Sequence, residues 1–207
     1  IFHLMGQHVN YKQRYRTKQA RFWASSYEDK RPELTNAQRK MLSHYDNATL
    51  YNDSIVAQIV KRFQKQDAIV IYVPDHGEEC YEENRGFICR NHSAEIDWPL
   101  AHYEFEIPFW IYCSPKYIRN HRDIYRQIRK AKDKRFMTDA LPHLLLYLAG
   151  IETPTYKEEY NILSSKYDEM RPRILKNSAD YDKLRDAHLE KIKKEESKKV
   201  KKKERRN

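Results

Sequence analysis

The residues whose types and position most clearly suit a chemical role are Asp75 and His76, which follow the apolar run at residues 68–74. A carboxylate and an imidazole are both ligand types that zinc accepts in proteins. In open α/β sheets, ligands bind just beyond the carboxyl ends of the strands, and this pair falls at such an end. The alternative is a strand end followed by a solvated polar turn. For an isolated Asp-His pair that alternative is favoured, so the assignment depends on the rest of the chain.

Two further histidines lie in loops beside predicted strands and have the same ligand chemistry. His8 follows a predicted short strand at residues 1–5, and His92 lies in the long polar segment after the DHGE motif. The other histidines of the chain lack this context. His8 and His92 therefore join Asp75 and His76 as candidate site residues.

The elements that must position these side chains alternate between strand and helix. Short apolar runs predict strands over residues 1–5, 68–74 and 107–113. Apolar residues at helical spacing, or charged runs, predict helices over residues 47–63, 117–132, 141–148 and 180–200. Asp46 or Asn47 is the predicted cap of the first helix. This alternation predicts an α/β fold with a mixed, mainly parallel sheet flanked by helices.

Composition restricts the class of protein. The chain has 207 residues, of which 40% are hydrophobic and 34% are charged, so it is long enough for one well-buried domain with an appendage. It has no apolar stretch near 18 residues, which predicts no membrane span, and no signal peptide pattern. Its first residues are apolar and read like the middle of a strand, so we expect a fragment of a longer protein.

The net charge of +10 is concentrated near the end of the chain. Residues 189–207 hold ten Lys or Arg and four Glu, a net charge of +6. Such a run is either a solvated helix end that frays into disorder or a surface attracted to an anionic membrane. RNA-binding signatures and zinc-finger spacings are absent, so nucleic acid is not an expected partner. We predict a catalytic domain over residues 1–187 and a basic tail, helical or disordered, over 188–207.

Three cysteines are too few for a disulfide scaffold, and their odd number leaves at least one thiol unpaired. Cys80 and Cys89 flank a polar segment and are able to bridge in an oxidising compartment. Cys113 lies in an apolar run and is predicted to be a buried thiol. Cysteine usage does not decide the compartment, and it leaves open whether Cys80 and Cys89 are bridged.

Four stretches of the chain carry a family resemblance. They are residues 3–8 (HLMGQH), 45–53 (YDNATLYND), 71–78 (IYVPDHGE) and 107–111 (IPFWI). On these residues the chain resembles the C-terminal part of the bacterial phosphoethanolamine transferases that modify lipid A, members of the alkaline phosphatase and sulfatase superfamily. The resemblance implies the C-terminal part of an alkaline phosphatase-like fold.

The resemblance also implies roles for the candidate residues. Asp75 and His76 correspond to ligands of the catalytic zinc ion. His8 and His92 correspond to catalytic histidines that help hold the transferred phosphate or a second metal. Imidazoles in these positions are able to donate hydrogen bonds to phosphoryl oxygens as negative charge builds.

The implied reaction uses a threonine, activated by zinc, that attacks phosphatidylethanolamine and releases diacylglycerol. The phosphoethanolamine then passes to a glycolipid of the lipid A or lipopolysaccharide type. In the family this threonine and a glutamate ligand lie upstream of DHGE, and neither is recognisable here. Thr17, Thr35 and Thr49 have the right chemistry in the wrong context. We therefore expect this chain alone to be inactive and to bind zinc weakly.

In the full-length protein, the resemblance implies an upstream membrane domain in the inner membrane, with the catalytic domain in the periplasm. Two alternatives remain open. One is a sulfatase or phosphodiesterase of the same superfamily, which would share the strand-end ligands. The other is a truncated, non-catalytic module whose basic tail docks at a membrane surface.

Two local motifs also allow two interpretations. Tyr45, Asp46 and Asn47 are either catalytic or the start of a helix with a buried tyrosine, and we favour the helix start. Glu78 and Glu79 either set the orientation and basicity of the ligand histidine as its hydrogen-bond partners, or they are exposed loop acids.

Overall fold

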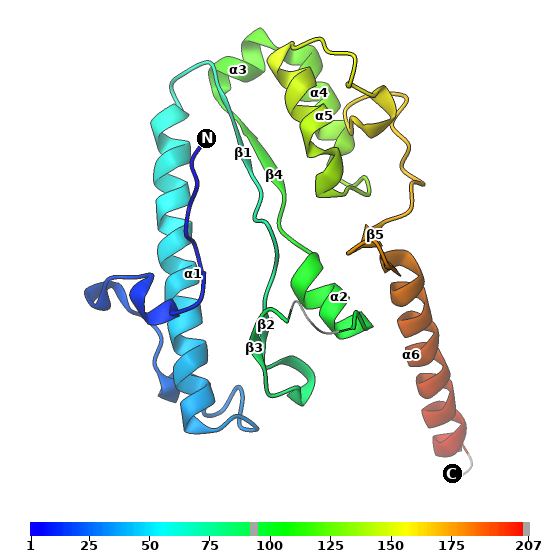
Figure 1. The fold of residues 1–207 in the computed structure, drawn as a ribbon. Coiled ribbons are helices and arrows are strands. Elements are labelled where there is room, and N and C mark those ends of the chain that lie inside the picture. Colours follow the sequence, from blue (N-terminus) through cyan, green and yellow to red (C-terminus); the bar gives the residue numbers. More distant parts are fainter. Residues whose placement is uncertain (92–94, 205–207) are drawn as a thin grey trace. The chain divides into compact units, whose positions relative to one another are not determined.

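The computed structural model describes residues 1–91 and 95–204. This part of the chain forms two compact units (Figure 1). Residues 1–91 and 107–117 belong to the first unit, and residues 95–106 and 118–204 to the second. The candidate residues that are described all lie in the first unit.

Helix α1, Asn36–Phe63, is the longest element of the first unit. It begins at Thr35, whose hydroxyl accepts a hydrogen bond from the Gln38 backbone N–H at 3.3 Å while the Thr35 N–H donates to Gln38 Oε1 at 2.9 Å. This reciprocal capping box satisfies two of the N–H groups that a helix start leaves unpaired. The predicted start near residue 47 is therefore wrong, because the cap lies further upstream.

The segment before α1 is built from three short 3-10 helices: η1 (Tyr11–Gln13), η2 (Thr17–Gln19) and η3 (Ala24–Tyr27). The strand predicted at residues 1–5 is absent. Ile1, Phe2 and Met5 are exposed, so these residues lack the burial that an apolar strand gains in a sheet. Tyr27 closes this segment onto a core that it shares with Leu42 of α1.

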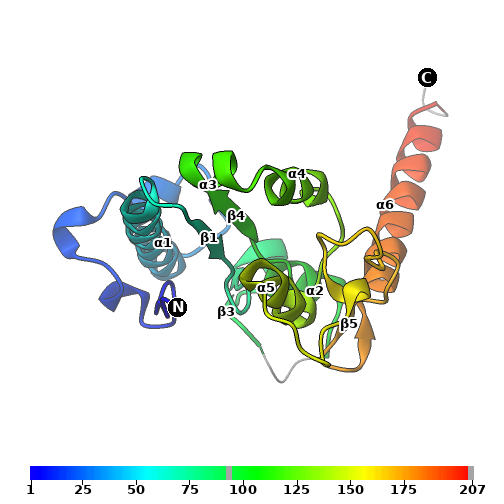
Figure 2. The same ribbon diagram turned by 90° about the horizontal axis from the view of Figure 1, so that it is seen from above.

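Two strands carry the candidate site, and both match the sequence prediction. Strand β1, Ile69–Tyr72, pairs with β4, Trp110–Cys113 (Figures 1 and 2). The Tyr72 and Trp110 rings stack with centroids 5.2 Å apart. Ser114 closes the far end of the pair, where its N–H donates to the Ala68 carbonyl at 3.0 Å.

The predicted parallel direction of the strands is wrong for the described part of the chain. The last residue of β1, Tyr72, faces the first residue of β4, Trp110, so β4 begins where β1 ends. A parallel pair instead needs a crossover that returns the chain to the start of the first strand. Within the described residues, each of the three two-stranded sheets is antiparallel.

The polar segment after β1 was predicted to be a loop, and it contains a small hairpin. Strand β2, Glu79–Cys80, pairs with β3, Ile88–Cys89, with the short helix η4, Glu82–Asn84, between them. Cys80 is buried in the core of the first unit, and both cysteines are free thiols. Register places Cys80 opposite Ile88 and Cys89 opposite Glu79, so the two cysteines occupy neighbouring pairs and not the same one.

This burial gives a prediction for thiol chemistry. Burial raises the pKa of the Cys80 thiol, and only the thiolate reacts with alkylating agents. A raised pKa keeps the thiol protonated at pH 8, so native-state alkylation of Cys80 is expected to be at least about 100-fold slower than in the urea-unfolded chain. Mass spectrometry of digests measures both rates, with the half-buried Cys89 as the internal comparison. A disulfide between Cys80 and Cys89 in the native chain would contradict the structure.

The second unit is mainly helical. Its elements are α2 (Trp98–Phe105), α4 (Arg122–Ala131), η5 (Thr138–Ala140), α5 (Leu141–Ala149), η6 (Glu158–Tyr160), β5 (Ile174–Leu175), β6 (Ala179–Asp180) and α6 (Tyr181–Glu204). Its core includes Ala101 and Tyr181. The Trp98 ring of α2 contacts two side chains of α6 that lie two helix turns apart. Its centroid is 5.6 Å from that of the Tyr181 ring and 5.3 Å from that of the His188 ring. These ring contacts fix the first turns of α6 on α2.

Several predicted helix limits can be compared with this unit. The apolar helix is confirmed as α5 and ends at Gly150, whose φ of +65° is the left-handed conformation that glycine adopts at little cost. The helix predicted over residues 117–132 is divided into α3, Pro115–Asn120, and α4, with His121 between them. The last predicted helix is confirmed as α6, and the predicted domain boundary at residue 187 falls inside it.

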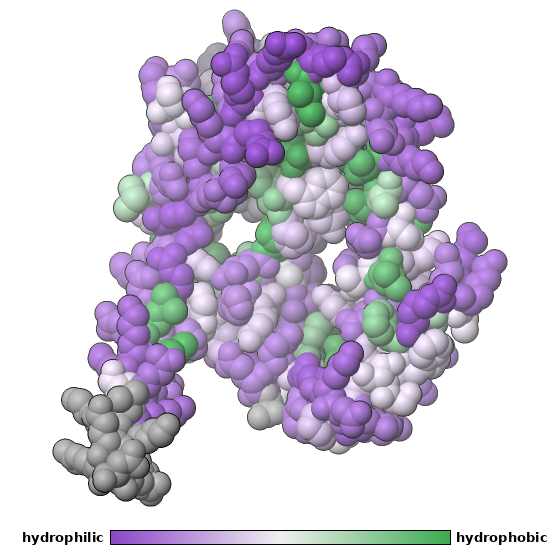
Figure 3. All heavy atoms as spheres, turned by 180° about the vertical axis from the view of Figure 1, so that it is seen from behind, coloured by the Kyte–Doolittle hydropathy of each residue, from purple (hydrophilic) through white to green (hydrophobic). Residues whose placement is uncertain are grey.

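Membrane-spanning character is not found in the described helices, none of which combines enough length with enough apolar character to cross a bilayer. Hydrophilic residues cover most of the face drawn in Figure 3, and hydrophobic residues form small separate groups on it. This surface agrees with the high proportion of charged residues in the sequence.

Candidate functional site

Asp75 and His76 follow β1 at its carboxyl end, as predicted. The His76 Nε2 atom lies 3.6 Å from Asp75 Oδ2, and the His76 Nδ1 atom lies 2.7 Å from the Gly77 carbonyl oxygen. A carbonyl only accepts hydrogen bonds, so in the neutral ring Nδ1 carries the proton and Nε2 carries the lone pair. The backbone thus turns the basic nitrogen of His76 toward the Asp75 carboxylate, which is 87% exposed.

The spacing of this pair fits a zinc ion. Two zinc–ligand bonds of about 2 Å at a tetrahedral angle hold their donor atoms roughly 3.4 Å apart. The 3.6 Å between Asp75 Oδ2 and His76 Nε2 agrees with that spacing, and both atoms are zinc donors. Among the described residues, no group of three or more His, Cys, Asp or Glu side chains is placed to hold a metal. The pair therefore fits half of a four-ligand zinc site.

Behind the pair, Glu78 forms the centre of a partly buried polar cluster. Its Oε2 atom accepts a hydrogen bond from the Tyr11 hydroxyl at 3.0 Å, and its Oε1 atom lies 4.0 Å from the Cys89 sulfur. Burial raises the pKa of Glu78, and the Tyr11 hydrogen bond and the charges of His76 and His8 oppose that rise. His8 and His76 thus act on the same carboxylate, although they lie far apart in the sequence.

The loop that carries His8 is fixed through its backbone. The Arg14 guanidinium donates to the His8 carbonyl at 3.0 Å and to the Val9 carbonyl at 3.0 Å. Tyr11, which is 3% exposed, packs its ring edge against the Tyr45 ring of α1 with centroids 5.2 Å apart. The loop backbone is thereby held while the His8 side chain remains exposed.

The YDN element is structural, as favoured from the sequence, but it lies inside α1 and not at its start. Asn47 is 3% exposed, and its Oδ1 atom accepts hydrogen bonds from the backbone N–H groups of Arg21 at 2.6 Å and Phe22 at 3.1 Å. Its Nδ2 atom donates to the carbonyls of Phe22 and Ser43, each at 2.8 Å. Asn47 therefore ties the segment before α1 to the helix. The neighbouring Asp46 accepts a hydrogen bond from the Tyr27 hydroxyl.

Other residues singled out in the sequence have defined places. Glu79 is fully buried and accepts a hydrogen bond from Arg85 at 2.9 Å, so the interpretation as an exposed loop acid is wrong for it. Thr35 caps α1, and Thr49 donates to the Tyr45 carbonyl within that helix. These two hydroxyls serve the helix backbone. His92 lies outside the described residues.

Comparison with known protein families matches residues 1–151 to the sulfatase family. The chain belongs to this family. The match covers more than half of the sequence and includes His8, Asp75, His76 and His92. The resemblance drawn from the four sequence stretches is therefore confirmed.

Among its relatives, this sulfatase-family chain is similar to phosphoethanolamine transferases. It is 31% identical to phosphoethanolamine transferase EptC of Escherichia coli strain K12 over 82% of the chain and 28% of EptC. It is also 31% identical to the Kdo(2)-lipid A phosphoethanolamine 7''-transferase of the same organism, over 65% of the chain and 23% of that enzyme. The chain thus spans less than a third of the length of these relatives.

A solved structure shows the same fold. The crystal structure of the C-terminal periplasmic domain of EptC from Escherichia coli, in complex with Zn, superposes with a TM-score of 0.68 and 27% identity, covering 86% of this chain and 50% of that one. The predicted alkaline phosphatase-like α/β class is confirmed by this match. The zinc ion belongs to that crystal structure, and in this sulfatase-family chain the corresponding observation is the 3.6 Å between Asp75 Oδ2 and His76 Nε2.

Two parts of the site were missed in the sequence. Tyr11 is absent from the candidate residues of the sequence, and it is the hydrogen-bond partner of Glu78. Cys89 was considered only for a disulfide, and it lies beside the same carboxylate. No local sequence pattern marks Tyr11, because its partner Glu78 lies 67 positions away in the chain.

Proposed function

We propose that the chain is the C-terminal part of the catalytic domain of a zinc-dependent phosphoethanolamine transferase. The observation that carries the proposal is the strand-end pair, with His76 Nε2 turned to Asp75 Oδ2 at 3.6 Å, in a chain 31% identical to EptC. The reaction moves phosphoethanolamine from phosphatidylethanolamine to a glycolipid of the lipid A or lipopolysaccharide type. The catalytic domain extends over residues 1–187 in this proposal, and residues 188–207 form the tail.

The residues of the chain have separate roles in this proposal. Asp75 and His76 hold the zinc ion, which when bound supplies a Lewis acid that lowers the pKa of the nucleophile and stabilises charge on phosphoryl oxygens. The Gly77 carbonyl keeps the proton on Nδ1 of His76, so that Nε2 remains the ligand atom. His8 and His92 donate hydrogen bonds to the phosphoryl oxygens as negative charge builds.

The proposal assigns the remaining chemistry to residues outside this chain. A threonine that carries phosphoethanolamine between donor and acceptor, and a glutamate that completes the zinc ligands, belong to the preceding part of the protein. Supporting this, Thr35 and Thr49 serve the α1 backbone. The matched part of the chain also spans only 28% of EptC. We infer that residues 1–207 alone are inactive.

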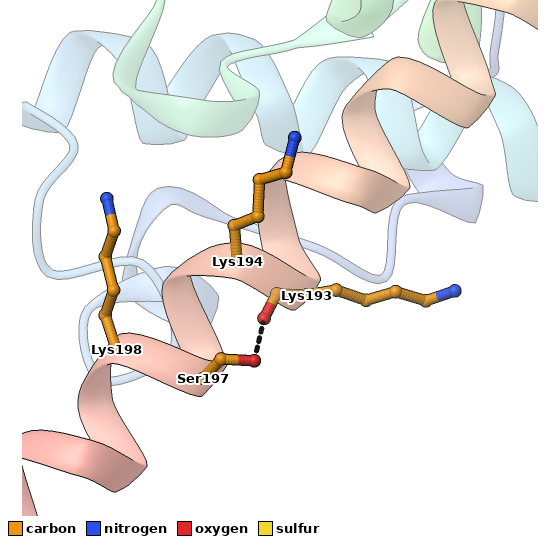
Figure 4. Close-up of a pocket in the computed structure, with 4 residues that line it drawn as sticks. All are labelled: Lys193, Lys194, Ser197 and Lys198. Carbon is orange, nitrogen blue, oxygen red and sulfur yellow. Dashed lines mark hydrogen bonds between the residues drawn. The ribbon is translucent and has the colours of Figure 1, made fainter.

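The partners and location follow from the same proposal. The donor is phosphatidylethanolamine, the acceptor is a glycolipid, and a domain outside this chain anchors the protein in the inner membrane with the catalytic domain in the periplasm. The basic tail gives a further membrane contact. Figure 4 supports this, because Lys194 and Lys198 extend to one side of α6, away from Lys193. The pocket in that view lies on the exposed surface of one helix, so we assign it no small-molecule ligand.

The experiment that tests the function uses the full-length protein with vesicles containing phosphatidylethanolamine and an acceptor glycolipid. The expected result is release of diacylglycerol together with an acceptor heavier by one phosphoethanolamine group, both measured by mass spectrometry. Chelation of zinc is expected to stop both products, because the nucleophile is no longer activated. Hydrolysis of a sulfate ester without transfer would instead assign the protein to the sulfatase alternative.

A further inference from the structure

Helix α4 presents two chemically different faces. Its inner side buries Ala131 and partly buries Ile124 and Ile128. Gln127 on this helix accepts a hydrogen bond from the Tyr147 hydroxyl of α5 at 2.8 Å. These contacts hold α4 in the second unit, so its outer side is presented by a fixed helix.

The outer side is strongly basic. Arg122, Arg126, Arg129 and Lys130 are all exposed, and their spacing of four, three and one residues places them on one side of the helix. We call these four residues the α4 basic face. The ion pair that the structure records for this face joins Arg126 to Asp123, whose side chains are 72% and 82% exposed. One carboxylate beside four cations leaves the face with a net positive charge.

The chemistry of this face favours phosphate groups. Arginine presents a planar fork of N–H donors that binds phosphate through two parallel hydrogen bonds, and three of the four cations are arginines. No large hydrophobic residue of α4 is exposed, so the face has nothing to insert into a hydrocarbon layer. A partner that fits it is a flat, multiply charged surface of phosphates that is contacted from outside.

We propose that the α4 basic face docks the protein on the headgroups of an anionic phospholipid membrane. The choice of lipid as the source of the phosphates rests on the proposed function, and the name of one relative includes lipid A. The residues of the α4 basic face belong neither to the basic tail nor to the proposed zinc ligands. It orients the second unit against the surface in which a lipid donor and a glycolipid acceptor lie.

The test is co-sedimentation of the 207-residue chain with vesicles of phosphatidylcholine alone or with phosphatidylglycerol added. Each cation near an anionic surface strengthens binding roughly fivefold, so the triple variant R122Q/R126Q/R129Q is expected to bind the anionic vesicles on the order of 100-fold more weakly. The matched control is K61Q/R62Q/K65Q, which removes three exposed cations at the end of α1. This control changes net charge equally and is expected to lose less than about fivefold.

A second variant separates charge from folding. R122K/R126K/R129K keeps the charge and loses the arginine forks, so it is expected to bind more weakly than the native chain and more tightly than the glutamine variant, with reversal at high salt for all proteins that bind. Equal losses for the α4 variant and its α1 control would overturn the proposal, as would equal binding to phosphatidylcholine alone. Vesicle binding needs neither zinc nor the transfer reaction. If the full-length protein transfers phosphoethanolamine but the α4 basic face does not bind vesicles, the docking proposal has failed and the proposed function stands. If the face binds vesicles but no transfer occurs, the proposed function has failed and docking stands.

Discussion

Replacing Asp75 with alanine in the full-length protein is expected to lower kcat/KM for phosphoethanolamine transfer by about 10³-fold or more. Metal-ion catalysis supplies several kcal/mol of transition-state stabilisation, and each 1.36 kcal/mol corresponds to about tenfold in rate. In the proposed function, loss of the Asp75 carboxylate removes one zinc donor and leaves His76 as the remaining ligand in this chain. Zinc content, measured on the purified variant, is expected to fall with the activity.

Exposure makes this substitution a clean test. The Asp75 side chain is 87% exposed, so its removal costs no packing, and a loss of activity with an unchanged unfolding midpoint reports function. Asp53→Ala is the matched control, because Asp53 is also an exposed carboxylate of the first unit. A D75A enzyme with full activity and full zinc content would refute the assignment of the ligand pair.

The chain of residues 1–207 is expected to bind zinc with a Kd of roughly 10 µM or weaker, since it supplies half of the proposed ligands.

Asn47→Ala is expected to lower the free energy of unfolding by about 3 kcal/mol, because the Asn47 side chain holds the segment before α1 on the helix. The substitution leaves the Arg21 and Phe22 N–H groups and the Phe22 carbonyl without the partner they have now. Each buried polar group left unpaired costs about 1–3 kcal/mol, less where water can enter. Urea unfolding followed by circular dichroism measures the change.

Asn52→Ala is the matched control, because Asn52 is also a buried asparagine of α1. Its side chain makes one long hydrogen bond, 3.4 Å to Gln7 Oε1, so its loss is expected to cost less than about 1 kcal/mol. Asn47→Asp keeps the two acceptor contacts but sets a buried carboxylate oxygen against the Phe22 and Ser43 carbonyls, so it is expected to destabilise at least as much as N47A. Equal unfolding midpoints for N47A and N52A would show that the YDN element does not hold the preceding segment on α1.

The parts of the fold that were predicted from the sequence are those with strong local signals. Strand β1 and strand β4 are apolar runs with polar flanks, and α5 ends at a glycine that adopts positive φ. The start of α1 was missed although its signal, Thr35 followed three residues later by Gln38, is visible in the sequence. The polar residues between that cap and residue 47 obscured the helical pattern.

The candidate site divides in the same way. Asp75 and His76 are adjacent in the sequence, so they lie close together in any fold. Recognising β1 placed them at the carboxyl end of a strand. The hydrogen bond between Tyr11 and Glu78 joins residues 67 positions apart, and no local pattern encodes such a contact. The direction of the strands also depends on how a long connection runs, which apolar periodicity does not report.

The hydrogen bond from His76 to the Gly77 carbonyl has a consequence for how such a site is inherited. The acceptor that selects the tautomer is the backbone of the very next residue, and a backbone carbonyl is not removed by substitution. The tautomer of His76 is therefore set within two consecutive residues. Mutations elsewhere in the protein can change the surroundings of the histidine without removing the acceptor that leaves the Nε2 lone pair free for the proposed zinc ion.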